Sequence, residues 1–319
     1  MPKEQRKFAD DGWAIWVDGE DMSTVYINDW INPKGKSYVD IAVRILGVKA
    51  CKFLHVYVPF CVSRDEIEDL SLLFNDTKVL NAVFSAACIV DYKKNEHASE
   101  IAYNGKTVDV IHMSTLEYQT ENISEGVLIN INLEELQPFI DNDEAYIVWR
   151  MPHKSLDEIF KPHVNMGSTL QRLVDILTTP VISEKYGYSI RINESRLLPD
   201  GITKIGGFHR QKLDKTVINI SVDESYELND AGCYRIRRLE GDIYKEYLPA
   251  NYSCEDVIVY QWRQKHETDL HGQFNYYYSI TKDSVSKRSM FLYLLLLPSI
   301  DVLGNFVADA IYALIDLLK

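Results

Sequence analysis

The sequence predicts an α+β fold with three parts, and three observations support it. Short runs rich in β-branched and aromatic residues recur between turn residues. Helix-start signals are few. No basic residue lies between Arg288 and Lys319, and this segment is mostly apolar. We therefore predict a mixed α+β domain over residues 1–160, a β-rich, sandwich-like domain with a leading helix over residues 161–285, and a hydrophobic helical tail over residues 286–319.

The first domain alternates predicted strands with turns at glycine, proline and aspartate. Strands are expected over residues 14–17, 38–48, 52–58, 107–111, 127–133 and 145–151. Ser63 followed by Glu66 is typical of a capping box, which predicts a helix that continues to about Phe74. The apolar stretch 79–91 is expected to end as a strand.

The second domain begins with a helix over residues 168–177, capped by Ser168, whose leucines recur at helical spacing. Strands separated by polar turns follow over residues 188–192, 216–222, 234–239, 256–262 and 274–280. Their spacing favours an antiparallel sandwich or a barrel-like module. The aromatic run 274–278 and Trp262 are expected to pack across neighbouring strands, with a binding surface as the alternative.

The tail has ordered polar positions. Residues 290–297 read MFLYLLLL, and Pro298 is followed by a second apolar run. The polar residues of this second run are spaced four, four, three and four apart and would share one helical face. They are Asp301, Asn305, Asp309, Tyr312 and Asp316.

The tail is long enough for a membrane interpretation. A helix over residues 290–318 would measure about 40 Å, against a hydrocarbon core of about 30 Å. Lys282, Lys287 and Arg288 precede it, where the positive-inside rule places cytoplasmic residues. The aspartates are costly in lipid unless several copies turn them toward a shared, water-filled axis, which would form a pore.

The same tail pattern has two other interpretations. A helix with a narrow polar stripe is also typical of a C-terminal helix buried in the fold or in an oligomer interface. A helix lying on a membrane surface is the remaining possibility. Location and oligomeric state would separate these interpretations.

Composition narrows the classes of function. The net charge of −13 disfavours direct nucleic-acid binding, which depends on lysine and arginine. The basic segment 235–238 is expected to be the polar face of a strand. The five scattered cysteines favour reduced, structural thiols, and no signal peptide is expected at the polar N-terminus. We predict no cofactor, no metal site and no catalytic residue.

One segment resembles a known enzyme family. The strand-like run Ile89-Val90 followed by Asp91, Tyr92 and Lys93 resembles the second half of the PD-(D/E)xK nuclease core. That resemblance implies a carboxylate that holds a divalent metal and a lysine that positions the attacking water. No proline–aspartate pair precedes the run, and the first carboxylate would be Asp76, or Glu66 or Asp69 on the preceding predicted helix.

These observations favour a non-enzymatic membrane effector with a sensing or regulatory body. In its organisation alone, the chain is similar to membrane-acting effectors of bacterial antiphage and abortive-infection systems. We expect a homo-oligomer or a protein partner, contact with membrane lipid through the tail, and a cytoplasmic body anchored in the inner membrane. The alternatives are a soluble interaction or sensor protein whose tail packs in a core or interface, and a metal-dependent nuclease using Asp91 and Lys93.

Overall fold

The structure is a computed structural model that describes most of the chain. The described residues are 10–19, 23–32, 35–84, 88–91, 95–103, 105–153, 181–208, 213–229, 232–249, 252, 255–265, 274–285 and 287–317. The chain divides into two compact units. The first unit comprises Met1–Lys161, Gly187–Glu224 and Asp230–Tyr278, and the second comprises Pro162–Tyr186, Ser225–Asn229 and Ser279–Lys319.

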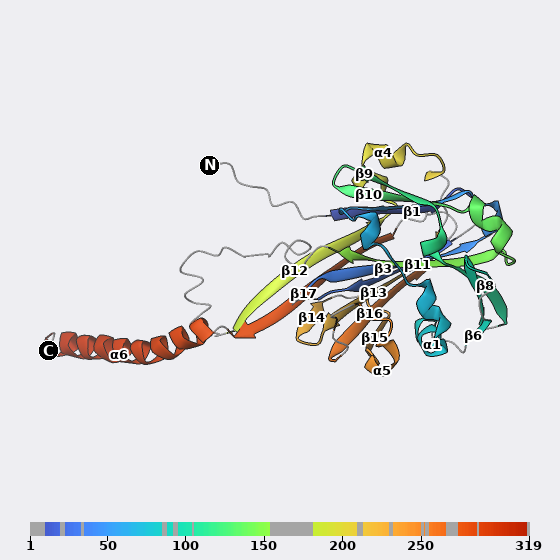
Figure 1. Cartoon of the computed structure of the whole chain (residues 1–319). Coiled ribbons are helices and arrows are strands. Elements are labelled where there is room, and N and C mark those ends of the chain that lie inside the picture. Colours follow the sequence, from blue (N-terminus) through green and yellow to red (C-terminus); the bar gives the residue numbers. More distant parts are fainter. Residues whose placement is uncertain are drawn as a thin grey trace. The chain divides into compact units, whose positions relative to one another are not determined.

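The predicted α+β, β-rich class is confirmed. Strands account for about 50% of the described residues and helices for about 26%. Among the described residues, the strands form two sheets (Figure 1). Each sheet contains strands from both the predicted mixed domain and the predicted β-rich domain. The predicted three-part division stays a prediction.

The first sheet has seven described strands in the order β14-β17-β12-β1-β4-β10-β9. Their bounds are β1 Asp10–Val17, β4 Phe53–Val58, β9 Tyr118–Ile123, β10 Gly126–Asn132, β12 Val181–Ile192, β14 Tyr226–Asn229 and β17 Phe274–Val285. Strand β1 changes partner along its length. Residues Asp10–Trp13 pair in parallel with β12, and Ala14–Val17 pair antiparallel with β4.

The second sheet has ten described strands in the order β15-β16-β13-β2-β3-β11-β8-β7-β6, with β5 paired to β11. Their bounds are β2 Ser23–Trp30, β3 Ser37–Leu46, β5 Glu68–Asp69, β6 Cys88–Asp91, β7 Ala98–Tyr103, β8 Lys106–Ile111, β11 Glu144–His153, β13 Leu213–Asp223, β15 Arg235–Arg238 and β16 Val257–Lys265. Strand β13 runs parallel to β2 and antiparallel to β16.

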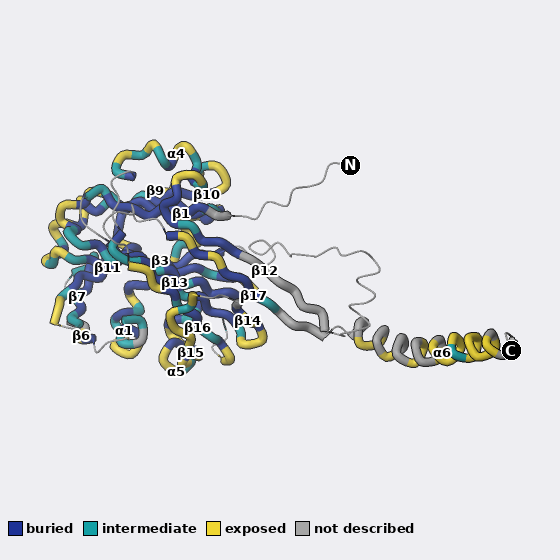
Figure 2. Tube along the Cα trace, turned by 180° about the vertical axis from the view of Figure 1, so that it is seen from behind, coloured by how far each residue is buried: buried dark blue, intermediate teal, exposed yellow. Residues whose placement is uncertain are grey.

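The two sheets pack face to face within the first unit. Alternate residues of β2 and β13, such as Ile27 and Ile218, are fully buried between them. The Tyr278 hydroxyl of β17 donates to Asp29 Oδ2 of β2 at 3.1 Å, which links the two sheets. Figure 2 shows this buried interior in dark blue.

Short helices cover the outer faces of the sheets. Helices α1 (Thr77–Phe84) and α5 (Gly241–Tyr244) contribute to a cluster of buried side chains on the ten-stranded sheet. Helix α4 (Asp200–Thr203) packs Ile202 against Trp16 and Leu128 of the other sheet. The outward sides of these helices are exposed (Figure 2).

Most predicted strands coincide with observed ones, but the predicted helix after Ser63 is wrong. The capping box forms, since the Ser63 backbone N–H donates to Glu66 Oε2 at 3.1 Å. It caps only a single 3₁₀ turn, Arg64–Glu66, and Glu68–Asp69 then adds to β11 as β5. A second 3₁₀ helix, Ser71–Asn75, follows. Tertiary pairing with β11 therefore outweighs the local helix signal.

The second unit contains helix α6 (Lys287–Leu317), with Pro298 inside it. The predicted helix over residues 168–177 lies outside the described residues. Four cysteines, Cys51, Cys61, Cys88 and Cys233, form no disulfide within the described chain.

Candidate functional site

A cavity of about 450 Å³ lies on the outer face of the ten-stranded sheet, within the first unit. Its floor is built from alternate residues of adjacent strands, because successive side chains of a strand point to opposite faces. Strand β2 contributes Tyr26, Asn28 and Trp30. Val217, Asn219 and Ser221 of β13 and Val259, Gln261 and Arg263 of β16 continue the floor. Phe84 of α1 and Tyr244 of α5 belong to its walls.

A polar row crosses the floor at right angles to the strands. The strand register aligns Arg235 of β15 with Gln261, Gln261 with Asn219, and Asn219 with Asn28. The Gln261 amide donates to Asn219 Oδ1 at 2.9 Å, and the Asn219 amide donates to Asn28 Oδ1 at 2.6 Å. These side chains are half-buried. They form a fixed ladder of amides, which we call the amide ladder.

Positive charge concentrates on this floor although the whole chain is acidic. Lys215, Arg235 and Arg263 line the cavity. Within the part of the chain that the structure describes, none of these three forms an ion pair with a carboxylate. Burial lowers the pKa of Lys215, and the neighbouring Arg263 guanidinium lowers it further. The cations therefore repel one another across the cavity.

Two further arginines of the cavity are held in place. Arg237 donates to the Tyr244 hydroxyl at 2.8 Å, and its guanidinium lies 5.4 Å from the centre of that ring. Arg44 forms an ion pair with Glu144, and the hydrogen bond from Arg44 to Glu144 raises the pKa of this arginine. The Tyr244 phenol is a neutral partner at neutral pH, so it holds the Arg237 side chain without supplying a counter-charge.

Aromatic rings line one end of the cavity. The Lys215 ammonium lies 5.6 Å from the centre of the Tyr26 ring, and the Tyr26 and Tyr146 rings are 6.2 Å apart. Phe84 lies 5.1 Å from Tyr146 and 5.2 Å from Tyr103 between ring centres. Tyr26, Phe84 and Tyr103 are only half-buried. Their exposed surfaces are available to a flat, apolar group.

The covered part of the same sheet face holds a different charge arrangement. Arg150 of β11 donates to both oxygens of Asp40 of β3, at 2.6 and 3.0 Å, and to the Tyr247 carbonyl at 2.7 Å. The Trp30 indole also donates to Asp40 Oδ2, at 2.6 Å. Both charged side chains are almost completely buried, so this pair supports the fold and is closed to ligands.

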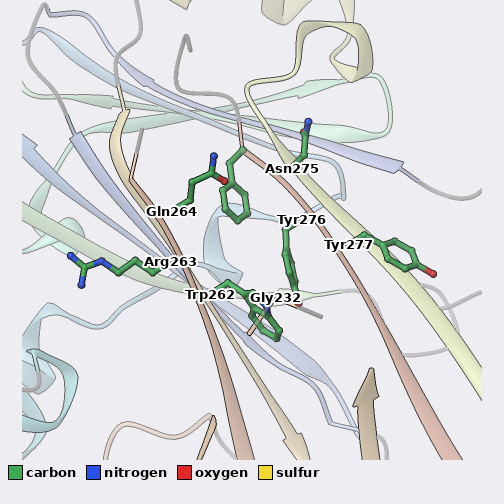
Figure 3. Close-up of a pocket in the computed structure, with 8 residues that line it drawn as sticks. Gly232, Trp262, Arg263, Gln264, Asn275, Tyr276 and Tyr277 are labelled. Atoms are coloured by element: carbon green, nitrogen blue, oxygen red, sulfur yellow. The ribbon is translucent and has the colours of Figure 1, made fainter. Parts of the chain in front are cut away.

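A second cavity, of about 420 Å³, lies between β16 and β17 (Figure 3). Trp262 and Tyr276 pack with ring centres 4.4 Å apart, while Tyr277 is half exposed. Figure 3 shows Arg263 and Tyr277 pointing away from this ring pair in opposite directions. The predicted packing of the aromatic run on Trp262 is present, but it joins strands of different sheets instead of neighbours in one sheet.

The predicted tail residues lie in or beside α6. Asn305 and Asp309 are exposed, and the side chains of Asp301 and Asp316 lie outside the described set. Lys287 and Arg288 begin α6, and Lys282 of β17 pairs with Tyr226. Among the described residues, no helix combines the length and the apolar character needed to span a membrane.

The residues of the nuclease hypothesis are only partly described. Asp91 ends β6 opposite Glu100 of β7, while Lys93 lies outside the described residues. The described part of the chain contains no group of three or more histidine, cysteine, aspartate or glutamate residues placed to hold a metal. The nuclease hypothesis stays a prediction.

Comparisons with known proteins assign no class to this protein, so its function has to be inferred from the geometry of the cavity. The sequence matches no known protein family, and no curated protein is significantly similar to it. Sequence reasoning missed the cavity because its cations come from three different strands, β13, β15 and β16, which only the pairing of the sheet brings side by side. One signal was present, since Arg235 and Arg237 alternate along a predicted strand and therefore share a face.

Proposed function

We propose that this protein is a non-enzymatic sensor whose cavity binds a small organic anion. One observation carries the proposal: Lys215, Arg235 and Arg263 line one cavity and form no ion pair with a described carboxylate. Like charges in a partly desolvated site repel each other, and a bound anion would turn that repulsion into attraction. We therefore infer that this group of cations binds an anion.

The size and lining of the cavity favour a small molecule. Its volume of about 450 Å³ lies within the range of about 300–1,000 Å³ typical of small-molecule sites. Tyr26 and Phe84 offer apolar surface beside the cations. A long polyanion would come close to much of the protein surface, and the overall charge of −13 would repel it. Nucleic acid is therefore not the expected ligand.

The test uses phenyl phosphate, which joins an aromatic ring to an anion. We expect it to bind in isothermal titration, and to bind more weakly as salt increases. Arg263→Gln should weaken binding, whereas Arg238→Gln should not, because Arg238 lies on the other face of β15 and pairs with Asp256. Failure of phenyl phosphate, phosphate and pyrophosphate to bind at millimolar concentration would refute the proposed site.

We also propose α6 as the effector segment of this sensor, acting at a membrane as in bacterial antiphage effectors. Support comes from the large apolar side chains that α6 exposes. These are Met290, Phe291, Leu294, Val302, Phe306, Val307, Ile311, Tyr312 and Ile315. Such a surface is costly in water and needs a lipid or protein partner. Self-association would bring the Asn305 and Asp309 positions of several copies together.

Vesicle flotation of the full-length protein tests this second part. We expect the protein to float with vesicles of bacterial lipids, and Phe306→Asp to reduce the floating fraction. Asp309→Leu should keep flotation and reduce the leakage of a trapped dye. Full-length protein that stays with the soluble fraction would instead support the alternative, in which α6 packs against a protein partner or a second copy.

A further inference from the structure

The amide ladder is a feature that simple anion binding does not require. Phosphate recognition needs only the cations, yet Asn28, Asn219 and Gln261 cross the middle of the cavity floor. Such a ladder is fixed in orientation, because each internal oxygen already accepts from the next amide. Fixed amides are suited to read a specific arrangement of donors and acceptors.

The two ends of the ladder offer opposite hydrogen-bonding groups. At one end, the Asn28 amide nitrogen has two N–H groups and donates to no described residue. At the other end, Gln261 donates through its amide nitrogen, and its Oε1 accepts from no described residue. These ends lie two strand spacings apart, about 10 Å, so they would meet different parts of one elongated ligand, such as a heterocyclic base at Asn28 and a hydroxyl-bearing sugar at Gln261.

Arg263 and Tyr26 lie on one side of this row, Arg263 toward its Gln261 end and Tyr26 toward its Asn28 end. Arg235 continues the row beyond Gln261, and Arg263 lies one position further along β16 on the same face. Tyr26 occupies the corresponding position on β2 and carries Lys215 near its ring. A planar base on Tyr26 would thus have phosphate-binding groups within the same cavity.

We propose that the ligand of this cavity is a nucleoside monophosphate or diphosphate. This inference rests on the proposed anion-binding function and specifies its ligand class. The base stacks at the aromatic end and meets the Asn28 amide, the ribose lies along the amide ladder toward Gln261, and the phosphate binds Arg235 and Arg263. A free mononucleotide suits the volume of about 450 Å³, which is at the smaller end of the range of about 300–1,000 Å³ for small-molecule sites.

Titration calorimetry with the full-length protein tests the inference. The probes are AMP, GMP, CMP and UMP, with ribose 5-phosphate, inorganic phosphate and the four nucleosides as controls. We expect at least one of the four nucleotides to bind about tenfold more tightly than ribose 5-phosphate. The same nucleotide should also bind about tenfold more tightly than its nucleoside, because the base and the phosphate each contribute hydrogen bonds. Both parts of the ligand would then be recognised.

Two variants and one control locate the site. Arg263→Gln should weaken nucleotide binding about tenfold, because it removes a charged hydrogen bond. Asn219→Ala breaks the ladder on both sides, so it should reduce nucleotide affinity to that of ribose 5-phosphate and leave ribose 5-phosphate binding unchanged. Arg238→Gln is the matched control and should bind like the unmodified protein, since its side chain faces away from the cavity.

The outcomes separate this inference from the proposed function. Equal affinity for every nucleotide, ribose 5-phosphate and phenyl phosphate would overturn the nucleotide inference and leave anion binding intact. No binding of any phosphate compound would overturn both. Nucleotide binding that survives Arg263→Gln and Asn219→Ala would place the site elsewhere and overturn the inference. So would binding of a single-stranded oligonucleotide without binding of any mononucleotide.

Discussion

On the outer face of the ten-stranded sheet, arginine is buried in an ion pair in the covered part and exposed without a described ion pair in the open part. Under the segment that follows α5, Arg150 has its donors satisfied by Asp40 and the Tyr247 carbonyl, and it is almost completely buried. On the open part, Arg235 and Arg263 are exposed and form no ion pair with a described carboxylate. The first arrangement supports the fold, while the second leaves charge available to a ligand. The same residue type thus has a structural use on β11 and, in the proposed site, a binding use on β15 and β16.

The largest expected effect is on the covered side. Arg150→Met removes the cation and leaves the Asp40 carboxylate buried, with the Trp30 indole as a remaining donor. Breaking a buried ion pair in this way typically costs about 3–5 kcal/mol. We expect that loss in the free energy of unfolding measured by urea denaturation. A loss below about 1 kcal/mol, as for an exposed pair, would contradict the structural role of this arginine.

An intermediate effect is expected from a carboxylate on the opposite face of β2. Burial raises the pKa of Asp29 to about 7, opposed by the hydrogen bond from Tyr278 and reinforced by Asp40. The folded state therefore binds this proton more tightly than the unfolded state, whose pKa is near 3.8. Stability associated with Asp29 is full below pH 4 and falls as the pH rises to about 7.

Asp29→Asn removes this titration and keeps an oxygen for the Tyr278 hydroxyl. Its free energy of unfolding, compared with the unmodified protein, should improve by about 2 kcal/mol between pH 5 and pH 8. Urea denaturation at the two pH values measures the difference. Asp242→Asn, at an exposed position of α5, is the control and should follow the unmodified protein. Parallel pH profiles for Asp29→Asn would show that Asp29 is ionised in the folded protein.

The smallest effect is expected on the open side. Without ligand, Arg263→Met should change the free energy of unfolding by no more than about 0.5 kcal/mol, because the side chain is exposed and repelled by Lys215. Phenyl phosphate should raise the melting temperature of the unmodified protein more than that of this variant. A large loss of stability without ligand would assign Arg263 to the fold and weaken the contrast with Arg150.

The sequence predicts the positions of the strands better than it predicts which strands pair. Runs such as 145–151 alternate or are apolar, so β11 was recognisable. Strand β2 has polar residues on both faces and β9 is polar almost throughout, so neither gives a clear strand pattern. The register and the parallel pairing of strands depend on contacts between residues that are far apart in the sequence. The cavity was missed for the same reason, because Asn28 and Asn219 meet only when β2 and β13 pair. The role of the hydrophobic tail stays a prediction, because a pattern of apolar residues does not specify what they contact.

The parallel pairing of β2 with β13 has a consequence for synthesis. Asn28 and Asn219 are separated by 191 residues, yet they lie side by side in the finished sheet. At about 5–20 residues per second, a ribosome would need about 10–40 seconds to make the second strand after the first. During that interval β2 has one unpaired edge, which favours aggregation. The nascent chain is therefore expected to depend on a chaperone until residue 223 has left the ribosome.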